Sequence, residues 1–211
     1  MRRIPVGARL ALAGLITVVA LAVALWPRHS DDTAARGDHP ANSGTTAALT
    51  ARSAAGLTQC PVPAADAVGR GPLAGLGLGC LADGKPVDLA AALAGKPALL
   101  NLWAYWCGPC AKELPDVQEY ARRAGNAITV LTVHSDPDEA RALALLTDLR
   151  VTLPGVFDPR AKVRTAVGAP AVLPVSVLLR ADGSVAEVVV RAFNGIDDIA
   201  DTVANKLGVA A

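Results

Sequence analysis

Two continuous apolar runs with a helix-like stretch between them form the centre of this sequence. Ala98 to Trp103 and Ala127 to Val133 are apolar at almost every position. Short runs of this kind are typical of strands that are buried on both faces of a sheet. A helix-like pattern from Cys107 to about Ala124 separates them. The pattern therefore predicts a strand, a helix and a second buried strand.

Shorter segments around this centre also alternate between strand and helix patterns. Asp83-Gly84 and Asp182-Gly183 each lie between two strand-like runs, and such pairs favour hairpin turns. The remaining predicted elements are, in chain order, a hairpin over 78–88, a helix from Leu89 to Ala94, a helix from Asp138 to Leu149, a strand from Gly155 to Phe157, a helix from Pro159 to Val167, hairpin strands from Val172 to Leu179 and from Ser184 to Ala192, and a closing helix from Asp197 to Leu207.

The N-terminal region has a different pattern. Leu10 to Trp26 is uncharged and almost wholly apolar, and as a helix it would span about 25 Å. Arginines precede it, which predicts a cytoplasmic N-terminus at residues 1–9, a single-pass transmembrane anchor at residues 10–26 and an extracytoplasmic domain after it. A cleaved signal peptide is the alternative, because small-x-small sites lie within the run. Both interpretations export the domain.

Composition sets the outline of the remaining chain. Residues 27–58 are rich in Ala, Ser, Thr, Asp and Gly without periodicity, so we expect a flexible linker. Residues 59–211 are long enough for one domain with a hydrophobic core, in a chain that is 52% hydrophobic. The formal net charge is only +1, and four arginines lie before residue 29. Nothing in this charge distribution indicates a nucleic-acid-binding protein.

The most specific chemical signal is Cys107-Gly108-Pro109-Cys110, where the first strand gives way to the helix. At a helix N-terminus the Cys107 sulfur meets unpaired backbone N–H groups and the positive end of the dipole, which favours the thiolate. The thiolate is the nucleophile in disulfide exchange, and Cys110 can resolve the mixed disulfide. A zinc site would need a second ligand pair, and the sequence has none at suitable spacing. We therefore favour dithiol redox chemistry over a zinc site or a structural disulfide.

Cys60 and Cys80 bracket a loop rich in proline and glycine. An exported compartment permits a structural disulfide between them. In the chain-entropy model, closing a loop of this length stabilises the fold by roughly 3 kcal/mol. A second redox pair is the alternative, but neither the spacing nor a helix start would activate these thiols.

The residues around the CxxC motif resemble the thioredoxin superfamily. Trp106 to Cys110 is the motif of thioredoxin itself, and the frames Leu100-Asn101-Leu102-Trp103-Ala104 and Cys110-Ala111-Lys112-Glu113-Leu114-Pro115 are similar to the TlpA/ResA branch of membrane-anchored members. The resemblance covers about residues 71–208. It implies an α/β, thioredoxin-like fold with a central mixed sheet flanked by helices, here extended by the N-terminal hairpin. It also implies thiol exchange with partner proteins, without a cofactor or a metal.

The resemblance assigns roles to further residues. It implies a cis peptide bond at Leu173-Pro174 beside the CxxC motif, which would leave the Leu173 backbone free to bond a substrate strand. Trp106 would contribute to the apolar rim around Cys107. Cytosolic thioredoxins carry a buried aspartate where this chain has Asn101, which cannot move protons. Glu113, three residues after Cys110, is the substitute, because a carboxylate there could accept the Cys110 proton. The alternative for Glu113 is a solvated first-turn glutamate.

These observations predict a membrane-tethered, extracytoplasmic thiol-disulfide oxidoreductase. The Gly-Pro dipeptide matches thioredoxin, whose potential is low, so we expect a reductant supplied by a transmembrane electron donor. Apocytochrome c thiols or misoxidised exported proteins are the candidate substrates. One alternative is a disulfide-forming oxidase. Another is a copper-binding assembly module that uses Cys107, Cys110 and His134, although a lone histidine at a strand end is more often a loop residue.

Overall fold

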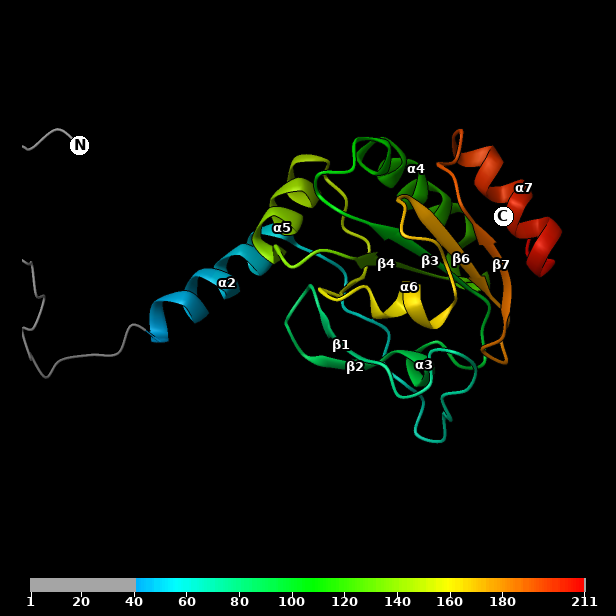
Figure 1. Cartoon of the computed structure of the whole chain (residues 1–211), viewed down its shortest axis with the longest axis horizontal. Coiled ribbons are helices and arrows are strands. Elements are labelled where there is room, and N and C mark those ends of the chain that lie inside the picture. The colour runs from blue at the N-terminus through cyan, green and yellow to red at the C-terminus, as the bar shows by residue number, and fades with distance from the viewer. Residues whose placement is uncertain (1–40, 211) are drawn as a thin grey trace, which may run out of the picture. The chain divides into compact units, whose positions relative to one another are not determined.

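The computed structural model describes residues 41–210. Its described residues form a seven-stranded sheet with helices on both faces (Figure 1). The strands are β1 (Gly77–Cys80), β2 (Pro86–Asp88), β3 (Ala98–Trp103), β4 (Thr129–His134), β5 (Gly155–Phe157), β6 (Val175–Leu179) and β7 (Val185–Val189). The helices are α2 (Ala41–Ala55), α3 (Leu89–Ala92), α4 (Gly108–Ala124), the 3-10 helix η1 (Gly125–Ala127), α5 (Glu139–Asp148), α6 (Lys162–Ala166) and α7 (Ile196–Leu207).

The sheet is mixed, with strand order β2-β1-β5-β4-β3-β6-β7. The inner pairs β3/β4 and β4/β5 are parallel, and the four other pairs are antiparallel. Strand β3 lies between β4 and β6, and all of its residues are buried. Burial on both faces explains why its sequence is a continuous apolar run interrupted only by Asn101. The expected sheet flanked by helices is confirmed.

Two cores cover the two faces of the sheet. Leu99 and Trp103 of β3 pack with α4, α5 and α7 on one face. Leu100 and Leu102 point the other way and pack with α3 and α6. Figure 1 shows the same division, with α4 and α7 on one side of the strands and α3 and α6 on the other. The alternation along β3 thus places Asn101 on the face that carries α4, two residues from Trp103.

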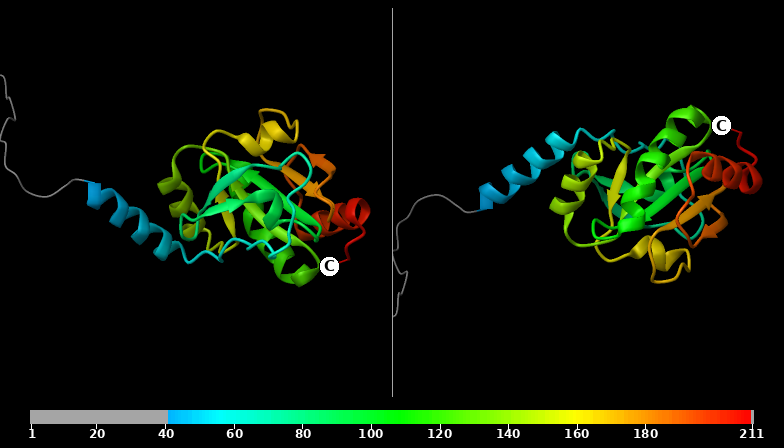
Figure 2. Two further views of the ribbon diagram at one scale, coloured as in Figure 1. Left: turned by 90° about the horizontal axis from the view of Figure 1, so that it is seen from below. Right: turned by 90° about the horizontal axis from the view of Figure 1, so that it is seen from above.

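The linker prediction is wrong for residues 41–55, which form helix α2 beside α5 (Figures 1 and 2). Its alanines are the best helix formers, and Gly56, with φ of +58°, ends it in the left-handed conformation. The side chains with reduced exposure follow the i, i+3, i+4, i+7 spacing of one helix face and are Ala48, Ala51, Arg52 and Ala55. This weak apolar stripe of alanines is the signal that the sequence interpretation missed.

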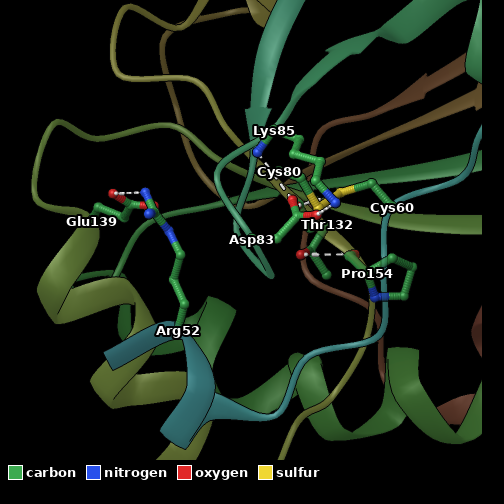
Figure 3. Close-up of a disulfide and its surroundings, with 9 residues drawn as sticks. Arg52, Cys60, Cys80, Asp83, Lys85, Thr132, Glu139 and Pro154 are labelled. Atoms are coloured by element: carbon green, nitrogen blue, oxygen red, sulfur yellow. Dashed lines mark hydrogen bonds and ion pairs between the residues drawn. A yellow bond between two sulfur atoms is a disulfide. The ribbon is translucent and has the colours of Figure 1, made fainter. Parts of the chain in front are cut away.

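An ion pair fixes α2 to the first turn of α5. The Arg52 guanidinium donates to both carboxylate oxygens of Glu139, with distances of 2.9 and 3.0 Å from Nη2. Both side chains are largely buried, at 18% and 22% exposure, and Figure 3 shows the pair beside the β1–β2 turn. The bidentate geometry is the strong form of this interaction.

A disulfide joins Cys60, in the segment after α2, to Cys80 at the end of strand β1 in the N-terminal hairpin (Figure 3). Strand β1 pairs with both β2 and β5, so the hairpin is part of the main sheet. The Cys60 sulfur lies 3.1 Å from the Gly155 carbonyl oxygen, which is a close contact because an oxidised sulfur has no proton to donate. This bond therefore ties the segment after α2 to strand β1, the second strand of the sheet.

Most of the remaining predicted elements are present with shorter ends. Helix α6 begins at Lys162 because the Asp158 carboxylate accepts from the N–H groups of Lys162 and Val163 at 2.8 Å. The predicted transmembrane segment, residues 10–26, lies outside the described residues. Within residues 41–210, no helix is long and apolar enough to cross a membrane.

Candidate active site

Cys107 lies at the N-cap of α4, directly after the turn that follows β3. Its N–H donates to the Ala104 carbonyl at 3.0 Å, and its own carbonyl accepts from Ala111 at 3.1 Å. The Cys107 sulfur forms a disulfide with Cys110 and also accepts the Cys110 N–H at 3.3 Å. Cys107 is 5% exposed and Cys110 is fully buried. Of the two cysteines, only Cys107 has any surface exposed to solvent, which favours it as the residue that an incoming thiol or disulfide meets.

The Cys107 sulfur acts as the N-cap of α4, because it accepts a hydrogen bond from a backbone N–H of the first turn. After reduction, the thiolate would accept the same backbone N–H at the positive end of the α4 dipole, which stabilises the charge. Pro109 lies in the first turn, where its missing N–H leaves no helical bond unmade. The local sequence thus builds a helix start around a nucleophile.

Glu113, three residues after Cys110 on α4, is buried with 2% exposure. Its Oε1 accepts from Asn101 Nδ2 at 2.6 Å, and its Oε2 accepts from the Phe193 backbone N–H at 2.9 Å. Burial raises its pKa above the ordinary value, while the two hydrogen bonds and the charge of Arg191 act in the opposite direction. The solvated-glutamate alternative is therefore wrong. A carboxyl group with a raised pKa, one helical turn after Cys110, is suited to exchanging a proton with a thiol.

Asn101 has a role that the sequence interpretation missed. We predicted only that it could not move protons. Its amide in fact bridges Glu113 and the hydroxyl of Ser176, which accepts from Nδ2 at 3.2 Å. The available signal was a single amide in the middle of an otherwise apolar strand, which requires a buried partner.

The Leu173-Pro174 peptide bond is cis, as the resemblance implied. Pro174 is buried immediately before β6, and Leu173 packs against the core cluster that contains Cys107 and Cys110. In the described part of the chain, no backbone hydrogen bond is formed by the N–H or the carbonyl of Leu173. Val172 beside it is 50% exposed. The backbone here is thus free to pair with an extended peptide.

The two tryptophans next to the motif have different environments. Trp103 is fully buried in the core, whereas Trp106 is 60% exposed beside Cys107 in the chain. The Trp106 indole N–H donates to the Asp136 carboxylate at 2.9 Å, which fixes the exposed ring. Hydrogen bonding by Trp106 and by the Asp138 N–H lowers the pKa of Asp136 against its partial burial. Asp136 was not among the predicted site residues, because only the fold brings it to the motif.

His134 is fully buried at the end of β4, so the prediction of a loop residue is wrong. Its ring lies 4.8 Å from the Trp103 ring and stacks on Phe157 at 6.1 Å between centroids. Burial lowers its pKa to about 4, so the imidazole is neutral at pH 7. In residues 41–210, no group of three His, Cys, Asp or Glu side chains is placed to hold a metal ion. Cys107, Cys110 and His134 do not form such a group while the two sulfurs are joined in a disulfide.

The comparison with protein families agrees with this geometry. The profile of the Redoxin family matches residues 61–205, and the chain belongs to this family. The resemblance to the thioredoxin superfamily and its ResA-like members is thereby confirmed.

Individual relatives can also be named. The chain is 30% identical to the thiol-disulfide oxidoreductase ResA of a Bacillus cereus strain over 111 residues, which are 51% of this chain and 62% of that protein. It spans less than two thirds of the length of the first curated relatives that it matches.

Solved structures show the same fold. A secreted Mycobacterium tuberculosis disulfide oxidoreductase homologous to E. coli DsbE aligns with a TM-score of 0.55 and 26% identity, covering 64% of this chain and 97% of that one. A DsbF homologue from Corynebacterium diphtheriae aligns with a TM-score of 0.57 and 26% identity, covering 71% and 99%.

Proposed function

We propose that this protein is a thiol-disulfide oxidoreductase that exchanges its Cys107–Cys110 pair with protein partners. The observation that carries the proposal is the setting of this pair: Cys107 at the α4 N-cap with a small exposed surface, Cys110 fully buried, and the buried carboxyl group of Glu113 one turn later. Relatives named as thiol-disulfide oxidoreductases support it.

The exchange would proceed in two steps. The Cys107 thiolate attacks a partner disulfide, forms a mixed disulfide and expels one partner thiolate. The Cys110 thiolate then attacks the Cys107 sulfur and releases the second partner thiol. The two protein cysteines are oxidised and the partner disulfide is reduced by the same two electrons. Glu113 takes the proton that Cys110 must lose before it attacks. The free Leu173 backbone and the Trp106 ring hold the partner segment.

The direction and location are further parts of the proposal. The Gly108-Pro109 dipeptide of low-potential thioredoxin favours a reductant, which would need a membrane electron donor and could serve cytochrome c maturation or exported-protein thiols. The disulfide between Cys60 and Cys80 supports an extracytoplasmic domain, because such bonds persist in oxidising compartments. The secreted Mycobacterium tuberculosis relative points the same way. Residues 10–26 would be the anchor.

The reduction potential of the Cys107/Cys110 couple tests the direction. We expect a value near or below about −250 mV in dithiothreitol or glutathione buffers, as for a reductant. A value between about −120 and −180 mV would instead identify an oxidase or isomerase.

A Glu113→Gln variant tests the proton step in the same buffers. Replacing the carboxyl group should remove the pH dependence of the resolving step and leave attack by Cys107 largely unchanged. Lys112→Gln, one position earlier on α4, is the matched control. An unaltered pH profile in Glu113→Gln would rule out the proton role.

A further inference from the structure

Three buried polar side chains from three elements form a short chain inside the core. Asn101 of β3 and Ser176 of β6 are register partners in the antiparallel pair, and Glu113 of α4 covers them. Their exposures are 0%, 1% and 2%. The Asn101 Nδ2 group donates to Glu113 at 2.6 Å and to Ser176 at 3.2 Å, whereas Asn101 Oδ1 is buried without a partner.

This arrangement suits only one charge state of Glu113. An ionised carboxylate accepts hydrogen bonds at both oxygens and needs the two donors that it has, from Asn101 and the Phe193 backbone. A protonated carboxyl group carries an O–H that must donate to an acceptor. Leaving a buried polar atom unpaired is unfavourable, so a rigid donor at this place would resist protonation.

An amide can resolve this conflict by rotating. The oxygen and nitrogen of an asparagine amide occupy nearly the same space, so a half-turn exchanges Oδ1 for Nδ2. Oδ1 would then accept from the Glu113 O–H and from the Ser176 O–H, because a hydroxyl donates as readily as it accepts. Both hydrogen bonds reverse together, and one amide atom is unpaired in each state. The Asn101 amide therefore makes two hydrogen bonds whether Glu113 is ionised or protonated.

We propose that Asn101 and Ser176 are positioning residues that reverse their hydrogen bonds when Glu113 gains or loses its proton. This inference rests on the proposed function, in which Glu113 receives the proton of Cys110. It also explains the substitution of aspartate by Asn101, since a second carboxylate 2.6 Å from Glu113 would repel it in the ionised state.

Other charges act on Glu113 from the surrounding elements. Arg191, before α7, favours the carboxylate, and Asp116 on α4 disfavours it. The Cys110 sulfur lies one turn earlier on the same helix. Arg191 only donates hydrogen bonds, and the Asp116 carboxylate only accepts them. The Asn101 amide and the Ser176 hydroxyl can do both, so these two groups form the reversible pair.

Nuclear magnetic resonance of the full chain, with both disulfides oxidised, tests the proposal. Glutamate carboxyl carbons and asparagine side-chain nitrogens are labelled, and the pH is varied through the titration of Glu113. We expect the Asn101 amide nitrogen to titrate with the same midpoint as the Glu113 carboxyl carbon. The coupling across the Asn101–Glu113 hydrogen bond should be present above the midpoint and absent below it. An amide that keeps this coupling at both ends would overturn the proposal.

Variants give a second measurement. Ser176→Ala should slow the resolving attack by Cys110 several-fold and change its pH profile, while the first attack by Cys107 is unchanged. Thr132→Val is the matched control, because it removes a buried strand hydroxyl that bonds the Pro154 carbonyl instead. Equal pH profiles in both variants would overturn the role of Ser176. The oxidised-state titration needs no exchange partner, so its result is independent of whether the protein exchanges thiols.

Discussion

The two disulfides of this domain are chemically the same bond, but their structural surroundings differ. Cys107–Cys110 spans three positions at the start of a long helix, and the buried carboxyl group of Glu113 follows one turn later on the same helix. Cys60–Cys80 spans 20 positions between an extended segment and strand β1, against a backbone carbonyl oxygen (Figure 3). Only the first has a helix N-terminus to stabilise a thiolate and a group that could exchange a proton with one. The difference shows that the surroundings, and not the bond, separate a candidate reactive pair from a candidate cross-link.

Removing Cys107 should have the largest effect on exchange. Cys107→Ser leaves no accessible nucleophile, so we expect the rate of exchange with a dithiol or a protein disulfide to fall at least about 10³-fold, to the background of free solution. A Cys60→Ser, Cys80→Ser double variant should retain most of the rate below its melting temperature. Substantial exchange in Cys107→Ser would contradict the division between the two disulfides.

The same double variant should have the larger effect on stability. Losing the cross-link over 20 positions should lower the free energy of unfolding by roughly 3 kcal/mol, measured in urea with the Cys107–Cys110 bond kept oxidised. Reducing only Cys107–Cys110, whose loop is three positions long, should change the urea midpoint much less. Equal losses would show that both bonds are structural.

Acid should lower the unfolding free energy of the domain through His134. Its pKa is about 4 in the folded protein and about 6.5 in an unfolded chain, so the unfolded state binds more protons between these values. The corresponding stability is complete above pH 6.5 and is lost as the pH falls to 4, in total about 3 kcal/mol.

The comparison of His134→Phe with the wild type isolates this contribution, because the other titrating groups are common to both proteins. We expect the difference in unfolding free energy to change with pH between 6.5 and 4 and to be constant above 6.5. A difference that does not depend on pH would show that His134 titrates normally.

The smallest expected effect concerns the ion pair beside the Cys60–Cys80 region. Arg52→Ala should destabilise the domain by about 1–2 kcal/mol, because it leaves the partly buried Glu139 carboxylate without its bidentate partner. Thermal unfolding at low and high salt measures this loss. Arg122→Ala breaks an exposed pair within α4 and should have no measurable effect. Equal melting temperatures in the two variants would mean that the ion pair between Arg52 and Glu139 does not stabilise the docking of α2.

The central part of the fold was readable from the sequence because burial on both faces leaves a simple signal. Strand β3 has the predicted bounds, and so does β5. Helix α2 was missed because alanine and threonine give a weak contrast between its faces, and its docking depends on Glu139, far along the chain. Local patterns carry no information about such a partner.

The candidate site was predictable in its cysteines and less so in their support. Cys107, Cys110 and the cis proline follow from a short motif and from the resemblance. The contacts of Asn101 with Ser176, and of Trp106 with Asp136, join residues 75 and 30 positions apart and exist only in the folded chain. His134 was misread because strand ends and loops look alike when the covering rings come from other strands.

The place of β1 in the sheet has a consequence for the order of folding. The disulfide joins β1 to the preceding segment over only 20 positions, while the contact of Cys60 with Gly155 on β5 joins residues 95 positions apart. Loop-closure entropy makes the longer connection costlier by about 1.4 kcal/mol before any contact energy is gained. During synthesis, β1 must also wait for β5 to leave the ribosome. The β1–β2 hairpin is therefore expected to pair with β5 only after β1 can already be cross-linked to the segment that follows α2.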